Sequence, residues 1–399
     1  MKRLSILIVA IIMAVMPLSA QKNPDLRVLP KATVQRAEMI LPQVKGYNIY
    51  KADFHIHTIY SDGDVSAKGR VHEAYYDGLD IVAITDHLEY RPYEQAMLRA
   101  TQGYHNVLPT AKNHKITLKA ADKDGILADL NIPYEEAKKP AERLGMLAIP
   151  GVEITRHPDK IGHYNALFVK DANTIYDADP EQAIRNAKAQ DALVMHNHPG
   201  WKRKTVDMND FHKKVYEAGL IDGVEIVNGG SFGPKLIKRC LDNKLFMAAA
   251  TDTHKTTAFA FEQRGYFRTC TFVLAKELTE KAVRTALEKN RTLAYAYDNV
   301  IGSESLVREF FYNSVSMKVA YTSSKGAKTV VLTNTTSIPY TLRRDGKGAG
   351  IVVKPFHSVS YVVAKDKNLN LTIANLWTAD DEHPNGMNLK VVYTAKELE

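Results

Sequence analysis

The stretch "DFHIHTIYSDG", from Asp53 to Gly63, places two histidines one residue apart, with an aspartate five positions after the second. In a β-strand, residues i and i+2 point to the same face, so this pattern would present the imidazoles of His55 and His57 side by side. Paired imidazoles can bind a metal ion. An isolated pair is nevertheless more often the polar face of a half-buried strand, so the rest of the chain has to decide.

Length and composition limit the possible functions. A chain of 399 residues predicts two domains, because single hydrophobic cores rarely grow beyond about 250–300 residues. The net charge of +8 indicates a modestly basic surface, and no arginine-rich stripe or aromatic-basic alternation predicts a nucleic-acid partner. Cys240 and Cys270 are too few for a thiolate metal site, and the sequence leaves open whether they pair.

The N-terminus has the pattern of a secretory signal peptide. Lys2 and Arg3 precede the apolar run "LSILIVAIIMAVM", which ends in Pro17 and small residues. We expect residues 1–20 to be a signal peptide cleaved near Ala20, residues 21–45 to be a linker, and the mature protein to be periplasmic or secreted. The apolar run of about 13 residues is shorter than the roughly 20 that a membrane-spanning helix needs, and no later stretch resembles a transmembrane segment.

Residues 46–300 alternate short apolar runs with amphipathic runs, which predicts βα units around a parallel sheet. The expected strands are residues 47–58, 79–87, 146–155, 163–169, 192–199, 223–229, 245–254 and 267–275. The expected helices are residues 66–79, 133–145, 179–190, 208–220 and 233–244. The pattern is weak from Tyr93 to Asp129, where we expect a long loop or insertion.

Almost every expected strand ends in histidine, aspartate or glutamate. This favours a barrel over an open sheet, because all strand ends of a (β/α) barrel meet at one face. From residue 305 to residue 399, short alternating runs separated by turn residues predict an all-β, sandwich-like accessory domain. We expect no chemistry there, and the isolated His357 and His383 are interpreted as surface residues.

The strand ends supply nine candidate metal ligands, which are His55, His57, Asp62, His87, Glu153, His163, His198, Asp252 and His254. Imidazoles and carboxylates without thiolates favour zinc, manganese or iron. Nine ligands are more than one ion takes, so we expect two or three divalent transition metal ions, and Glu153 is suited to bridge two of them. A metal centre explains this coincidence better than several unrelated strand ends.

The motifs "DFHIHTIYSDG", "ITDH", "GVEIT", "GHYNAL", "HNHPGW" and "TDTH" resemble, in this order, those of the polymerase and histidinol phosphatase (PHP) family of metallophosphoesterases. The resemblance covers about residues 50–275 and implies a distorted (β/α)7 barrel with a di- or trinuclear centre. It implies three ligand sets: His55 and His57 with Glu153 and Asp252; His87 and His254 with Asp62; and Glu153 with His163 and His198. Many members carry histidine at the position of Asp62, and of the two histidines in "HNHPG" only His198 fits the motif.

The resemblance is greatest to secreted phosphodiesterase-like members, so the expected activity is hydrolysis of small phosphodiesters by a metal-bound hydroxide that attacks phosphorus in line. The alternatives are a phosphomonoesterase like histidinol phosphatase, and a non-catalytic module that binds envelope or glycan and keeps a vestigial barrel. Asp86 and Glu225 are candidates to orient a ligand or move a proton, or are ordinary polar strand ends. Arg156 and Lys255 are candidate phosphate contacts, or solvated charges. The sequence leaves the natural substrate, the metal and the oligomeric state open.

Overall fold

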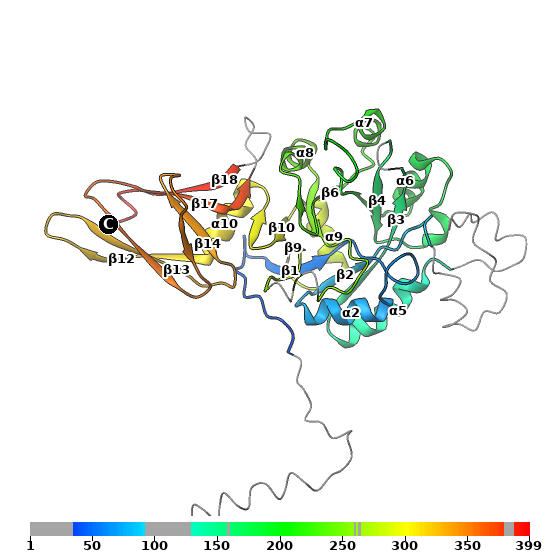
Figure 1. Ribbon diagram of the computed structural model, residues 1–399, viewed down its shortest axis with the longest axis horizontal. Coiled ribbons are helices and arrows are strands. Elements are labelled where there is room, and N and C mark those ends of the chain that lie inside the picture. Colours follow the sequence, from blue (N-terminus) through cyan, green and yellow to red (C-terminus); the bar gives the residue numbers. More distant parts are fainter. Residues whose placement is uncertain (1–34, 92–128, 158–159, 259–260, 262–264, 379–386) are drawn as a thin grey trace, which may run out of the picture. The chain divides into compact units, whose positions relative to one another are not determined.

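A mixed β-sheet runs through most of the molecule (Figure 1). The computed structural model describes residues 35–91, 129–157, 160–258, 261, 265–378 and 387–399. The expected signal peptide, most of the expected linker and nearly all of the expected insertion after Tyr93 lie outside these described residues. Cys240 and Cys270 are both buried and unpaired, which answers the question that the sequence left open.

The N-terminal part contains a strand at each of the eight expected positions. They are β1 (Asn48–Asp53), β2 (Ile81–Ile84), β3 (Leu147–Thr155), β4 (His163–Leu167), β5 (Leu193–Asn197), β6 (Gly223–Asn228), β8 (Phe246–Ala250) and β9 (Cys270–Ala275). Their order in the sheet is β9-β1-β2-β3-β4-β5-β6-β8, and a two-residue strand, β7 (Ser231–Phe232), pairs with β6.

The sheet is rich in parallel pairs but is not parallel throughout. β1 to β3 are mutually parallel, as are β5, β6 and β8, whereas β4 is antiparallel to both of its neighbours and β9 is antiparallel to β1. The short connection between β3 and β4 explains the first exception. A parallel pair needs a crossover of a dozen residues or more, and only residues 156–162 separate these two strands.

The sheet closes on itself at the end where the candidate ligands lie. Beyond the end of β1, Ile56 forms a parallel bridge with Thr253, which lies beyond the end of β8. The Asp252 N–H donates to the His55 carbonyl at 2.8 Å, and the His57 N–H donates to the Thr253 carbonyl at 3.1 Å. The segment after β1 therefore meets the segment after β8, a strand at the other edge of this part of the sheet, as the closure of a barrel requires.

Helices cover the outside of this sheet. The expected helices are present as α2 (Ala67–Tyr76), α5 (Ile132–Arg143), α6 (Pro180–Ala189), α7 (Asp210–Glu217) and α8 (Lys235–Asn243). Their starts follow from local capping chemistry: the Ser66 side chain accepts from the Gly69 N–H, and Asp179 caps α6 just before a proline at its first position. Helices α2 and α5 pack against each other and against β2 (Figure 1).

The sheet continues into the C-terminal region. β10 (Thr292–Ala296) and β11 (Asn299–Ile301) follow β9, with α9 (Glu280–Glu288) before them, and β11 pairs in parallel with β17 (Leu369–Thr378). β14 (Tyr340–Arg344) and β18 (Met387–Tyr393) pair with β17, and β15 (Ile351–Val353) pairs with β14. Helix α10 (Glu304–Ser314) leads into a second sheet of β12 (Val315–Thr322), β13 (Lys328–Asn334) and β16 (Ser358–Val363).

The two C-terminal sheets share one apolar core. Val330 and Leu332 of β13 are buried in the same cluster as Leu342 of β14 and Ile373 of β17. Side chains alternate between buried and more exposed along β13 and β14, as expected for sheets that pack face to face. The molecule is thus a mixed α/β fold with a C-terminal β region. None of the helices within the described residues combines the length and apolarity needed to cross a membrane.

Candidate metal centre

Strand ends from all around the barrel place their polar side chains at one cavity of about 470 Å³. The cavity is lined by the candidate ligands Asp62, His87, Glu153, His163, His198, Asp252 and His254. His55 and His57, which follow β1, are fully buried and contact several of these side chains. The structure therefore brings all nine sequence-predicted side chains together.

The antiparallel direction of β4 explains why His163 belongs to this group. Most of the nine side chains lie at or beyond the C-terminal end of a strand, but His163 is the first residue of its strand. Because β4 runs opposite to β3 and β5, its beginning lies at the same edge as their ends. His163 pairs with Thr155 at the end of β3 and with Asn197 at the end of β5.

The deepest ligand atoms converge within hydrogen-bonding distance of one another. His55 Nε2 lies 3.1 Å from His57 Nε2, 3.3 Å from Glu153 Oε1 and 3.2 Å from Asp252 Oδ1. His57 Nε2 lies 3.1 Å from the same oxygen of Asp252. Two imidazole nitrogens that face each other between carboxylate oxygens form a donor set suited to a cation.

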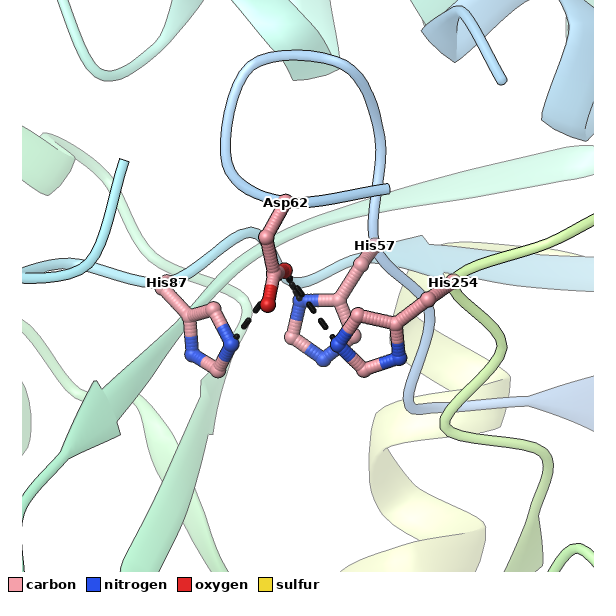
Figure 2. Close-up of side chains that lie close together, drawn as sticks. All are labelled: His57, Asp62, His87 and His254. Atoms are coloured by element: carbon pink, nitrogen blue, oxygen red, sulfur yellow. Dashed lines mark ion pairs between the residues drawn. The ribbon is translucent and has the colours of Figure 1, made fainter. Parts of the chain in front are cut away.

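A second group surrounds Asp62. Figure 2 shows its carboxylate pointing from the loop after β1 toward three imidazoles. Asp62 Oδ1 lies 3.7 Å from His57 Nδ1, 3.4 Å from His87 Nε2 and 3.2 Å from His254 Nε2, and it is a buried atom without a hydrogen-bond partner. The aspartate thus occupies a position from which it can serve as a ligand.

Glu153 links a third group to the first. His163 Nδ1 lies 3.2 Å and His198 Nε2 lies 3.6 Å from Glu153 Oε1. The side chains form four overlapping sets whose ligand atoms lie within 4.8 Å of one another: His57, Asp62, His87 and His254; His55, His57 and Glu153; His55, His198 and Asp252; Glu153, His163 and His198. Glu153 belongs to two of these sets, as a bridging carboxylate would.

The charges of the centre are strongly interdependent. Burial, together with the charge of His87, lowers the pKa of His57 to about 4. Burial would also lower the pKa of His87, but the carboxylates of Glu153 and Asp62 outweigh it and raise this pKa to about 10. Against the opposing effect of burial, the neighbouring imidazoles hold the pKa of Asp62, Asp252 and Glu153 below the usual range. Ionised carboxylates packed against imidazoles fit divalent cations well.

Two predicted supporting residues have different surroundings. Glu225 Oε1 lies 3.2 Å from His55 Nδ1, and its Oε2 accepts from the His198 N–H at 2.7 Å, so Glu225 orients two candidate ligands. Asp86 is not among the residues that line the cavity, and it accepts hydrogen bonds from the Thr58 N–H, the Thr58 hydroxyl and the Ser61 hydroxyl at 2.5–2.8 Å. Asp86 therefore stabilises the loop that carries Asp62.

His198 and His196 have opposite positions although they are two residues apart. His196 lies outside the cavity, where its Nδ1 is 2.9 Å from the Tyr216 hydroxyl. In a regular strand both imidazoles would lie on one face, but His198 has a left-handed backbone with φ of +27°. Asp252 is also left-handed, with φ of +52°. Such strain in residues other than glycine is typical of functional sites.

The two predicted phosphate contacts have different positions relative to the cavity. Arg156 lines the cavity, but its guanidinium forms an ion pair with Glu89, donates to the Asp177 carbonyl at 2.6 Å and lies over the ring of Tyr176. Lys255 is exposed and is not among the residues that line the cavity. The partners of Arg156 lie far from it in the sequence, so its contacts could not be predicted from its sequence position alone.

Four further residues contribute to the centre beside the candidate ligands. The Asn197 amide donates to Glu153 Oε1 at 2.9 Å, and the Thr155 hydroxyl lies 2.6 Å from His87 Nδ1. Tyr90 and Trp201 line the cavity mouth. Asn197 and Trp201 belong to the stretch "HNHPGW", and Thr155 belongs to "GVEIT". Their position next to candidate ligands is the sequence feature that indicates a place at the centre.

Comparison with known proteins agrees with this geometry. The PHP domain model matches residues 53–334. A crystal structure of a two-domain protein from Bacteroides vulgatus, containing a predicted PHP-like metal-dependent phosphoesterase, is 31% identical, with a TM-score of 0.77, over 90% of this chain and 99% of its own.

More distant structures add no argument because their TM-scores are low. A candidate metal-dependent phosphoesterase from Bifidobacterium adolescentis is 16% identical with a TM-score of 0.38, over 60% of this chain and 96% of its own. A lesion-specific endonuclease from Pyrococcus furiosus is 15% identical with a TM-score of 0.37, over 64% of this chain and 59% of its own. No curated protein gives a significant match. The family model and the Bacteroides structure, which both extend over most of the chain, show that this protein belongs to the PHP domain family.

Proposed function

We propose that the protein is a metal-dependent phosphoester hydrolase that acts on small phosphodiesters. One observation supports this most strongly: nine imidazole and carboxylate side chains converge on a single cavity, with ligand atoms within 4.8 Å of one another in each set. Membership of the PHP domain family and the likeness to a protein containing a PHP-like metal-dependent phosphoesterase support the same class of reaction.

The four overlapping sets indicate which residues would hold the ions. His57, Asp62, His87 and His254 form one site, and Glu153, His163 and His198 form another. His55 belongs to two sets between them, one with Glu153 and one with Asp252. The donor atoms suit zinc, manganese or iron. Two or three bound divalent ions would supply an acidified water and positive charge opposite the phosphoryl oxygens.

The residues that line the cavity favour attack by water over a covalent enzyme intermediate. Among the described residues lining it, the hydroxyl groups are those of Tyr90 and Thr155. The Thr155 hydroxyl lies 2.6 Å from His87 Nδ1 and 3.2 Å from Glu153 Oε2, so it already contacts two candidate ligands. Asn197 and Glu225 keep the neighbouring ligands in place, which preorganises the centre.

The charge of the cavity favours diesters over monoesters. A monoester carries about two negative charges at neutral pH, whereas a diester carries one. Among the described residues lining the cavity, the lysine and arginine side chains are represented by Arg156 alone, and its guanidinium is paired with Glu89. Apart from the imidazoles, which would bind the metal ions, the protein thus offers little positive charge of its own for a dianion. A phosphomonoesterase is the second candidate, because bound metal ions would also attract the dianionic group of a monoester.

The test is a comparison of initial rates on bis(p-nitrophenyl) phosphate and p-nitrophenyl phosphate with the metal-loaded protein. We expect a higher kcat/KM for the diester. We also expect His57→Ala to abolish turnover and the exposed His357→Ala, in the C-terminal region, to leave it unchanged. A preference for the monoester would contradict the diester assignment. Turnover of neither ester would contradict the hydrolase assignment and favour a non-catalytic binding module with a vestigial barrel.

A further inference from the structure

A second cavity adjoins the metal centre. It has a volume of about 190 Å³, and His198 and Trp201 line both it and the first cavity. Polar and apolar side chains both line the second cavity, and its apolar side chains come from Pro199, Trp201, Val206, Ile226, Phe232 and Leu236. A group attached to phosphorus at the metal centre therefore has a neighbouring space, which shares His198 and Trp201 with the first cavity.

The polar side chains of the second cavity are engaged with the metal centre. Glu225 accepts from the His198 N–H and contacts His55, and the Asn228 amide donates to Glu225 Oε2 at 3.2 Å and to Asp252 Oδ2 at 3.1 Å. Ser231 is exposed. A polar group placed among Phe232 and its apolar neighbours would find few hydrogen-bond partners, and burying it would be unfavourable.

The C-terminal region supports one wall of this cavity. The ring of Phe232 packs edge-on against that of Trp377 in β17, with ring centroids 5.5 Å apart. The Trp377 indole N–H donates to Asn299 Oδ1 at 3.1 Å, which fixes the orientation of the tryptophan. The β-rich region therefore contributes to the shape of the space beside the metal centre.

We propose, on the basis of the proposed phosphoesterase function, that the second cavity is an apolar subsite that binds a hydrophobic organic group joined to the phosphorus. The substrate class is then a phosphoester with an aryl-sized or alkyl group. When such a group binds, its own apolar surface and the apolar side chains of the cavity are both removed from water, which is favourable. Trp201 lines both cavities, and its ring centroid lies 5.1 Å from that of His163 and 5.3 Å from that of His198.

The test compares binding of phenylphosphonate and methylphosphonate to the metal-loaded full chain by isothermal titration calorimetry. Both probes carry the same anionic group and neither needs turnover. We expect phenylphosphonate to bind about tenfold more tightly or better, which corresponds to about 1.4 kcal/mol. Val206→Phe fills the subsite and should remove this preference. The matched control Val362→Phe, at a 64% exposed position on β16, should keep it.

Ser231→Phe, from an exposed position on β7, fills the subsite from another side and should also remove the preference. Equal affinities of the wild type for the two phosphonates, or equal weakening of both by the two filling variants, would overturn the apolar subsite while leaving the proposed hydrolase in place. A preference for phenylphosphonate without turnover of any ester would support the subsite and overturn the hydrolase. Failure of both phosphonates to bind would overturn both proposals.

Discussion

Glu225 illustrates how a residue that is not a candidate ligand can control the metal centre. Its carboxylate contacts the imidazole of His55 and accepts from the backbone of His198, where the backbone is left-handed. The contact fixes which nitrogen of His55 faces the cavity, and the backbone hydrogen bond stabilises the strained position of His198.

Glu225→Gln tests this positioning role. We expect kcat/KM for a diester to fall by about 10- to 100-fold, because the amide is a weaker acceptor for His198 and no longer favours one tautomer of His55. Metal content should fall with it, and the far-UV circular dichroism spectrum should stay unchanged. Lys214→Gln, which removes the ammonium of an ion pair with Glu181 on the outside, is the control. Unchanged kinetics and metal content in Glu225→Gln would contradict the role.

For single residues, the sequence predicted which side chains lie together, because the end of a strand can be recognised from the neighbouring residues. It could not predict what each one contacts. Arg156 is predicted as a phosphate contact from its position, whereas its ion pair with Glu89 is visible only in the structure. His196 and His198 lie apart, and the backbone at His198 departs from the strand conformation. The loop that carries Asp62 is held by hydrogen bonds from Thr58 and Ser61 to Asp86, which lies beyond another strand.

Among the elements, α2 holds together the strand ends that close the barrel. Arg70 of α2 is buried and donates to the carbonyl of His57 at 2.7 Å, of Thr253 at 3.1 Å and of Lys255 at 2.8 Å. It also forms an ion pair with Glu73 at 2.8 Å. One guanidinium thus connects the segments that follow β1 and β8, both of which carry candidate ligands.

Arg70→Met should therefore destabilise the fold by about 3–5 kcal/mol, since it leaves buried carbonyls and a carboxylate without their partner. The measurement is the free energy of unfolding from urea denaturation, for wild type and variant. Arg185→Met is the matched control, because this arginine is 46% exposed in its pair with Glu181, and removing it should cost less than about 1 kcal/mol. Similar losses in both variants would show that Arg70 has no special structural role.

The elements were predicted well where the pattern is periodic and poorly where tertiary contacts decide. The eight expected strands and five expected helices are present, because apolar periodicity and caps are local. The direction of β4 was missed, since alternation of apolar and amphipathic runs does not report strand direction. Helices α9 and α10 and strands β10 and β11 lie around the expected domain boundary at residues 300–305, where we assigned no elements.

For the whole molecule, the pairing of β11 with β17 makes the C-terminal region a continuation of the barrel sheet. Val300 of β11 is paired with Leu376 of β17, 76 residues later, and no local signal indicates such a long-range pair. This pairing also brings Trp377 to Phe232 beside the metal centre. The accessory β region was predicted from its alternating pattern, whereas its contribution to the site depends on tertiary packing.

The central claim is that the converging side chains bind several metal ions. Metal analysis of the purified protein by inductively coupled plasma mass spectrometry tests it most directly, after expression with added zinc, manganese and iron. The four overlapping ligand sets predict two or three equivalents of transition metal per chain, and the His57→Ala variant, which disrupts two of the sets, should retain at least one equivalent fewer. Less than one equivalent in the wild-type protein would contradict the account.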